Sequence, residues 1–392
     1  MSELLESRWQ DTKKALMEGL NGQKAKVMET TLENTRKHLS ESATAGATSA
    51  GNVATLNRVI LPVIRRVMPT VIANELVGVQ PMTGPVGQIH TLRVRYSDST
   101  DGGDVNTTAG EEALSPFKIA EAYSGNNGSP ASAAASSSLE GQAGNRLSIQ
   151  ILKQTVEAKT RKLSARWTFE SAQDAQAQHG IDVEAEVMAA LAQEITAEID
   201  QEVLASLENL AGAAAESYDQ SSVSGTATFV GDEHAALAVQ INRVSNLIAQ
   251  RTRRGAGNWA VVSPFALTIL QSATTSAFAR TTEGTFEAPT NTKMVGTLNN
   301  AMKVYVNTYA NDTSPVLIGY KGSSESDAAA FYCPYIPLMS SGVVLDPSTF
   351  EPVVSFMTRY GYVELSNTAS SLGNAADYLG KVAITDGNVK FS

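Results

Sequence analysis

The chain has 392 residues, 42% of them hydrophobic and 18% charged, which is enough for two or three core-forming units. Its net charge is −10, whereas a protein that binds free nucleic acid is usually basic. The one cysteine, Cys333, excludes an intrachain disulfide, and we expect it to be a small buried hydrophobe. No apolar run approaches the ~18 residues that span a membrane, and the N-terminus lacks an apolar signal core, so we expect no membrane partner.

The N-terminal part of the chain changes character twice. Residues 1–41 are polar and helix-prone, and their apolar stripe predicts a helix that docks on a partner or stays mobile. Residues 42–51 contain only small residues and predict a flexible linker. Residues 53–77 predict an apolar helical segment that Pro62 and Pro69 interrupt.

The segment from Val77 to Pro85 carries two glycines and two prolines but no catalytic side chain. Proline fixes φ and removes a backbone donor, while glycine permits φ values that other residues avoid. We therefore interpret 77–85 as a segment that shapes the backbone.

Two stretches in which apolar and polar residues alternate flank a long polar segment. Residues 89–96 and 147–169 alternate apolar and polar side chains, which predicts strands. Residues 97–146 between them are rich in Ser, Gly, Ala, Asn and Asp. We expect the two strands to pair as the stem of a long projecting loop.

The strongest predicted helix covers residues 182–210, where apolar residues recur every four positions and Asp182 can cap the N-terminus. At 1.5 Å per residue it would be roughly 40 Å long, and Gly212 would end it. A second helix is predicted over 233–251, followed by a buried strand and a helix start over 258–264. Strands and short turns are expected over 292–365, and a final strand in the tail 366–392.

Charge is unevenly distributed along the chain. From Trp167 to Asn242 there is no Lys or Arg, and basic residues cluster on either side. One interpretation is a solvated acidic helix face. The other is acidic surface that meets basic surface on a neighbouring subunit, which would set register and partner choice. The candidates for such intersubunit contacts are Arg251, Arg253, Arg254, Lys159, Arg161, Lys162, Glu194, Glu198 and Glu202.

The sequence offers no catalytic, cofactor-binding or metal-binding constellation. The four histidines are scattered, without the spacing of a metal site. Gly141 and Gly144 lie in a low-complexity stretch that no helix pattern follows, unlike a phosphate loop. Carboxylates over 182–208 follow the solvent face of a helix rather than forming an acid–base pair. We therefore expect no enzyme.

Five separated segments resemble the major capsid proteins of T-even-type tailed bacteriophages, in order and spacing, over roughly 53–363. They are the segment 77–85, Ala177–Glu198, Arg251–Asn258, Gly319–Gly322 with Asp327–Leu338, and Asp346–Gly361. The resemblance implies an α+β chain with the HK-97-type capsid fold. In this fold an N-terminal arm, an extended E-loop, a peripheral domain with a long spine helix, and an axial domain form a flat subunit.

The resemblance also places these parts along the chain. The arm would be 1–70, of which 1–52 is expected to be flexible or processed. The peripheral domain would combine 71–95, 166–212 and 343–370. The E-loop would be 96–165, the axial domain 213–342 and the C-terminal tail 371–392.

The family is trimmed by a prohead protease after a Leu/Ile-x-Glu pattern, which Leu39-Ser40-Glu41 fits, so Glu41 is the candidate processing site. The implied function is a major capsid protein that assembles into hexamers, and pentamers, of an icosahedral or prolate head around double-stranded DNA. The implied partners are further copies of the chain, scaffolding protein, portal, and vertex or decoration proteins, with assembly in the bacterial host cytoplasm. An encapsulin-like compartment shell, or an enzyme with an unrecognised site, is the alternative.

Overall fold

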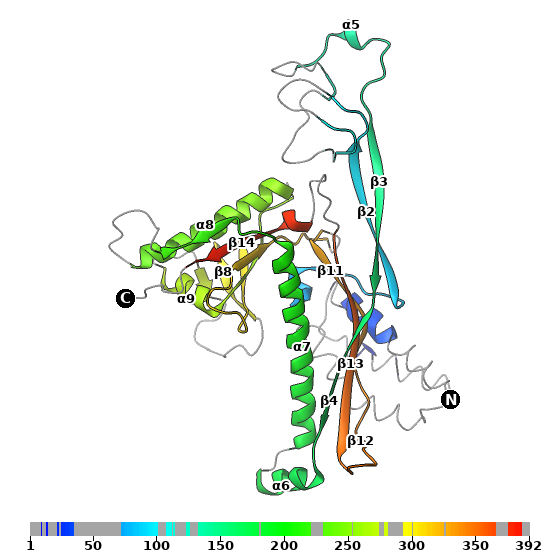
Figure 1. Ribbon diagram of the computed structural model, residues 1–392, viewed down its shortest axis with the longest axis vertical. Coiled ribbons are helices and arrows are strands. Elements are labelled where there is room, and N and C mark those ends of the chain that lie inside the picture. Colours follow the sequence, from blue (N-terminus) through cyan, green and yellow to red (C-terminus); the bar gives the residue numbers. More distant parts are fainter. Residues whose placement is uncertain are drawn as a thin grey trace. The chain divides into compact units, whose positions relative to one another are not determined.

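A computed structural model of the chain divides into two compact units (Figure 1). Unit 1 comprises residues 1–87, 155–206 and 331–363, and unit 2 comprises 88–154, 207–330 and 364–392. The structure describes residues 9, 13–14, 22, 25–34, 72–100, 107–111, 113, 123–125, 132–179, 182–220, 230–252, 254–273, 278–280, 293–299, 301–324, 327–365 and 375–385. Both helices and sheets are present, which confirms the α+β class.

Unit 1 is built on a five-stranded sheet. Its strands are β1 (Gly78–Val79), β4 (Lys159–Arg166), β11 (Ala330–Ser340), β12 (Val344–Leu345) and β13 (Pro352–Glu364). β1 pairs in parallel with β11, β11 neighbours β13, and both β12 and β4 pair antiparallel with β13. Val354, Phe356, Thr358 and Tyr360 are buried while the alternate residues between them are partly exposed, as expected for a strand with one face on a core.

The segment from Val77 to Pro85 forms the edge of this sheet, which agrees with its interpretation as a backbone-shaping segment. After β1, the amides of Gln80 and Met82 donate to the carbonyls of Tyr332 and Pro334, each over 3.0 Å. The short helix α4 (Ala73–Leu76) precedes β1. The rest of the predicted helical segment 53–77, and the linker 42–51, lie outside the described residues.

The long helix is α7 (Val183–Leu210), 28 residues, or about 42 Å at 1.5 Å per residue. Asp182 Oδ1 accepts the Glu184 amide over 3.1 Å, so the predicted cap is present. The four-residue repeat is buried at Leu191, Ile195, Ile199, Val203 and Leu207. Gly212 follows the helix with φ +68°, a conformation that favours glycine. Helix α6 (Phe169–His179) precedes α7.

A two-stranded ribbon consists of β2 (Val86–Tyr96) and β3 (Leu147–Glu157), most of whose residues belong to unit 2 (Figure 1). This pairing confirms the predicted stem for the first half of 147–169. The second half was predicted wrongly, because β4 pairs with β13 over Lys159–Arg166. Beyond the stem, Tyr96, Ala113 and Tyr123 form a small buried cluster, and α5 (Ser136–Leu139) is exposed.

Unit 2 also contains a seven-stranded sheet in the order β5-β14-β10-β6-β9-β8-β7. The strands are β5 (Glu216–Tyr218), β6 (Trp259–Val262), β7 (Phe278–Arg280), β8 (Lys293–Leu298), β9 (Met302–Val306), β10 (Val316–Gly319) and β14 (Leu379–Ile384). Helix α8 (Val230–Thr252), helix α9 (Pro264–Ser272) and the 3-10 turn η3 (Ala375–Tyr378) accompany the sheet. The predicted helix over 233–251, the strand and helix start over 258–264 and the final strand are therefore confirmed.

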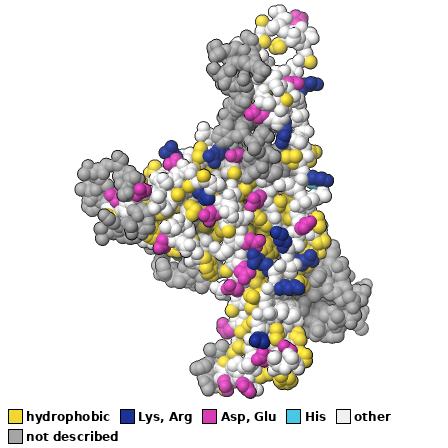
Figure 2. Space-filling view, in the orientation of Figure 1, with side chains coloured by type: hydrophobic (Ala, Val, Ile, Leu, Met, Phe, Trp, Pro, Cys, Tyr) yellow, Lys and Arg dark blue, Asp and Glu magenta, His cyan; other side chains and the backbone are white. Residues whose placement is uncertain are grey.

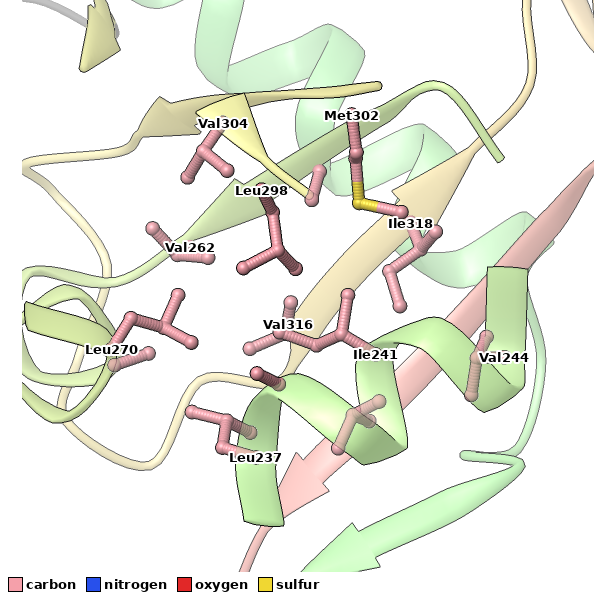
Figure 3. Close-up of a cluster of buried hydrophobic side chains, with 14 of the residues drawn as sticks. Leu237, Ile241, Val244, Val262, Leu270, Leu298, Met302, Val304, Val316 and Ile318 are labelled. Carbon is pink, nitrogen blue, oxygen red and sulfur yellow. The ribbon is translucent and has the colours of Figure 1, made fainter. Parts of the chain in front are cut away.

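The core of unit 2 joins α8 to this sheet. Leu237, Ile241 and Val244 of α8 are buried together with Val316 and Ile318 of β10 (Figure 3). Side chains from β6, α9 and β9 complete the cluster. The apolar spacing of α8 thus reflects one face packed on a sheet.

Candidate assembly surfaces

Arg161 on β4 is the centre of a charged cluster in unit 1. Its Nη1 lies 2.7 Å from Glu198 Oε2 and its Nη2 lies 2.5 Å from Glu202 Oε2. Glu198 and Glu202 are four residues apart on α7, so they lie on the same helix face. Arg161 Nε also donates to the Tyr360 hydroxyl over 2.6 Å, and that hydroxyl donates to Glu202. The guanidinium therefore links β4 to α7 and β13.

The hydrogen bonds in this cluster favour the charged forms of Arg161 and Glu202. Partial burial opposes the charged form of Glu202, but hydrogen bonds from Tyr360 and Arg161 keep the pKa of Glu202 below its ordinary value. Burial, and then the hydrogen bond to Glu202, raise the pKa of Tyr360. Burial opposes the charged form of Arg161 as well, but its bonds to Glu202 and Tyr360 outweigh this and raise the pKa of Arg161. Arg161 and Glu202 therefore stay ionised at neutral pH, and the Tyr360 hydroxyl stays protonated.

The other charged residues singled out in the sequence lie in different settings. Lys159, Lys162 and Glu194 are exposed. Where β4, β13 and α7 are drawn in Figure 1, dark blue and magenta side chains lie next to one another in Figure 2. Arg251 is half-buried in the last turn of α8. Arg253 and Glu41 lie outside the described residues.

Arg254 is part of a second cluster, in unit 2. Its Nη1 lies 2.6 Å from Asp327 Oδ1, and the Tyr378 hydroxyl donates to the same oxygen over 3.4 Å. Gly255 lies against the Tyr320 ring, where an added Cβ would be 2.5 Å from the ring. Burial raises the pKa of Tyr378 to about 12, so its hydroxyl remains a donor. The cluster ties the loop after α8 to η3 and to the loop after β10.

The ribbon carries apolar side chains in an unusual place. Leu147, Ile149 and Ile151, at alternate positions of β3, have exposed fractions of 53%, 68% and 67%. Alternate residues of a strand point to the same face, so these three form one exposed apolar face of a ribbon only two strands wide. A two-stranded ribbon is marginally stable by itself.

Asp200 is a buried carboxyl group on α7, only 1% exposed. Its Oδ1 accepts the Ile72 amide over 2.9 Å, whereas its Oδ2 has no hydrogen-bond partner among the described residues. Burial raises the pKa of Asp200 to about 7, against the smaller effect of the hydrogen bond from Ile72. This group therefore titrates near neutral pH.

The sequence patterns did not single out four of the residues in these clusters, namely Asp327, Tyr360, Tyr378 and Asp200. Asp327 and Tyr360 do lie in segments that carry the resemblance, which is the signal that could have found them. Tyr378 and Asp200 lie outside those segments, and no local pattern marks them.

The described residues hold no group of three or more His, Cys, Asp or Glu side chains that could bind a metal ion. Among the helices described, none is long and apolar enough to cross a membrane. Cys333 is buried as predicted, and burial raises the pKa of its thiol to about 12.

A two-stranded ribbon, a long helix and two separate sheets are parts that the resemblance to the HK-97-type capsid fold implied. The class of protein is therefore a viral capsid subunit. A family model described as "Major capsid protein Gp23" matches residues 53–384, most of the chain. The chain belongs to this family.

Individual relatives are similar over comparable lengths. The major capsid protein of Vibrio phage KVP40 is 29% identical over 85% of this chain and 81% of its own. The major capsid protein of Enterobacteria phage T4 is 29% identical over 81% of this chain and 76% of its own. A solved structure, the capsid of Myoviridae phage XM1, is 10% identical with a TM-score of 0.44, over 80% of this chain and 92% of that one.

Family membership confirms the main expectations from the sequence. The chain is a major capsid protein of a tailed phage, a component of the virion that builds the head shell from many copies of itself. It is a structural protein and not an enzyme. The encapsulin-like alternative is not favoured, because the family is one of phage capsid proteins.

Proposed function

We propose that copies of this chain form hexamers, with pentamers at the vertices, that close into an icosahedral or prolate head around double-stranded DNA. Assembly takes place in the host cytoplasm with a scaffolding protein and a portal. The observation that carries the proposal is the match of residues 53–384 to the capsid family. The net charge of −10 fits a container whose wall does not trap its genome.

The parts of the subunit have separate roles in this proposal. The arm is 1–70, and the peripheral domain (71–95, 166–212 and 343–370) has α7 as its stiff axis. The E-loop (96–165) projects toward neighbours, and the axial domain (213–342) meets its copies at the centre of each hexamer. Strands β4 and β11, which these boundaries place in the E-loop and axial domain, pair with β13 in the sheet of unit 1.

The apolar face of β3 supports a role for the ribbon in contacts between copies. Leu147, Ile149 and Ile151 are exposed on a ribbon that the rest of the described chain does not cover at these positions. Packing on a neighbouring copy would remove them from water, at roughly 25 cal/mol per Å² of apolar area. Many such modest contacts make a closed shell durable while misplaced subunits can still leave.

Charged residues contribute contacts between subunits in the same proposal. Lys159, Lys162 and Glu194 are exposed and able to reach a neighbour. Arg161 and Arg254 pair within the chain, at 2.5–2.7 Å from their carboxylates, and they would act by presenting a fixed charge pattern. Such patterns favour correct register more than affinity.

Heads purified after co-expression with the scaffolding protein and portal would test this proposal. We expect nuclease-resistant double-stranded DNA inside filled heads. Processing after Glu41 predicts a virion protein that lacks its first 41 residues, whereas an intact mass of 41.4 kDa would contradict processing. Heads filled with an enzyme instead of DNA would contradict the proposal.

A further inference from the structure

The two faces of strand β4 carry different side chains. Arg161 points toward α7, where it holds Glu198 and Glu202. Successive side chains of a strand point to opposite faces, so Lys162 and Arg166 point to the other face of the sheet of unit 1. Lys162 is exposed, and the side chain of Arg166 is 70% exposed. β4 therefore directs two cations away from the long helix of its own chain.

Strand β13 adds a third cation to this face. In the register of β4 with β13, Met357 lies opposite Lys162, so Arg359, two residues further along β13, belongs to the same face. Among the described residues, the ion pair that this face makes is a long one, with 3.7 Å between Arg166 Nη1 and Glu351 Oε2. We call Lys162, Arg166 and Arg359 the basic sheet face.

The outer side of α7 carries the opposite charge. No Lys or Arg occurs from Trp167 to Asn242, so no cation interrupts the acidic residues of the helix. Glu186 and Glu194 are exposed, and neither side chain forms an ion pair within the described part of the chain. We call these two residues the acidic helix face.

The spacing of the charges matches between the two faces. Lys162 and Arg166 are four residues apart on a strand, about 13 Å at 3.3 Å per residue. Glu186 and Glu194 are eight residues apart on a helix, about 12 Å at 1.5 Å per residue. Two cations of one chain can therefore meet two carboxylates of another at the same time. Within one chain these residues do not pair, because α7 lies on the Arg161 side of the sheet.

We propose that the basic sheet face of one copy binds the acidic helix face of the next copy, with Lys162 and Arg166 against Glu186 and Glu194. The inference rests on the proposed shell assembly and specifies one of its contacts. Each subunit then offers a different surface to each of two neighbours, and such a head-to-tail contact forms a ring when the rotation between copies closes. Two copies that meet through the same face bring like charges together, which selects against that orientation.

Two charge-reversal variants test the contact. Lys162→Glu with Arg166→Glu makes the sheet face acidic, and Glu186→Lys with Glu194→Lys makes the helix face basic. Each double variant should raise the critical concentration for assembly by about tenfold or more, because attraction becomes repulsion. The chain with all four substitutions should return to within about threefold of the parent, because the pairs are restored with their signs exchanged.

The double variants also control for net charge. They move the net charge of −10 by four units in opposite directions, so an effect of net charge alone would weaken assembly in one variant and strengthen it in the other. A mixture of the two should assemble, because copies that alternate around a ring restore every contact. With folding checked by circular dichroism, double variants that assemble like the parent would overturn the inference. Failure of both the mixture and the fourfold variant to recover would overturn it as well.

Zero-length crosslinking separates this inference from the proposed function. A carbodiimide joins a lysine amine to a carboxylate in direct contact. A mixture of isotopically labelled and unlabelled parent should therefore yield Lys162 joined to Glu186 or Glu194 of another copy, identified by mass spectrometry. Assembled particles without this product would overturn the inference and leave the shell intact. A parent that does not assemble, even with scaffolding protein, would contradict the proposed function instead. Crosslinking of the concentrated subunit then decides, and absence of the product there would overturn the inference too.

Discussion

Arg161 Nη2 lies 2.5 Å from Glu202 Oε2, although the two residues are 41 positions apart in the chain. The ion pair joins a strand to the long helix, and Tyr360 connects both to β13. Three elements of unit 1 thus share one polar cluster, which fixes how the helix lies against the sheet.

Replacing Arg161 with Ala should lower the free energy of unfolding of the unassembled subunit by about 1–2 kcal/mol. Hydrogen bonds to charged groups are worth more than this, but all three charged side chains are about a third or more exposed and are screened by solvent. Urea unfolding would measure the loss. Lys162→Ala, on the exposed side of the same strand, is the matched control. Equal stabilities of the two variants would contradict a structural role for the cluster.

Asp200 predicts a pH dependence of opposite sign to that of a typical carboxyl group. The pKa of Asp200 is raised from 3.8 to about 7, so the folded chain binds this proton more tightly than the unfolded chain. The contribution of Asp200 to the free energy of unfolding is therefore largest below about pH 4. It falls as the pH rises from about 4 to about 7, and it stays constant above about pH 7. The slope reaches about 1.4 kcal/mol per pH unit.

The Asp200→Asn variant should lose this part of the pH dependence. Urea unfolding of parent and variant between pH 4.5 and 8 would measure the difference in slope. Glu194→Gln, an exposed position on the same helix, should keep the parent slope. If the free energy of unfolding of Asp200→Asn changed with pH as steeply as that of the parent, the carboxyl group of Asp200 would not titrate in this range.

Gly319 should not tolerate alanine. A Cβ added there would lie 2.1 Å from the ring of Trp259, a fully packed side chain of unit 2. We expect Gly319→Ala to cost about 3 kcal/mol in the free energy of unfolding, because the ring has to move within a packed core. Gly144→Ala, where nothing lies within 4 Å, should change it by less than about 0.5 kcal/mol. Similar thermal stability of the two variants would refute the packing described at β10.

The apolar face of β3 predicts a defect in assembly without a defect in folding. Ile149→Asp places a charge on a side chain that is 68% exposed, so the subunit should fold normally. Its critical concentration for assembly should rise by about tenfold, because a contact worth at least about 1.4 kcal/mol is lost. Gln150→Asp, on the opposite face of the strand, is the control. The same shift in both variants would argue against Ile149 as a contact.

Local patterns predicted much of the fold. The four-residue apolar repeat over 182–210 identified α7, and the valine-rich run before Pro264 identified β6 and the start of α9. In each case the signal lies within one element, so the physical cause is local.

Long-range pairings could not be predicted in this way. Nothing in residues 159–166 indicates that they pair with β13, about 190 positions away, rather than continue the ribbon. The Asn34 amide reaches Tyr335 across 301 positions, whereas the sequence predicted only that the N-terminal helix docks on a partner or stays mobile. Charge runs indicated Arg161 and Arg254 as interaction residues but could not distinguish partners in the same chain from partners in another.

Light scattering with electron microscopy of the same purified sample would show whether the chain assembles into shells. We expect closed shells, tubes or hexameric capsomers, formed by the chain alone or together with its scaffolding protein. A monomer of about 41 kDa at every salt concentration, also after co-expression with the scaffolding protein, would contradict this expectation.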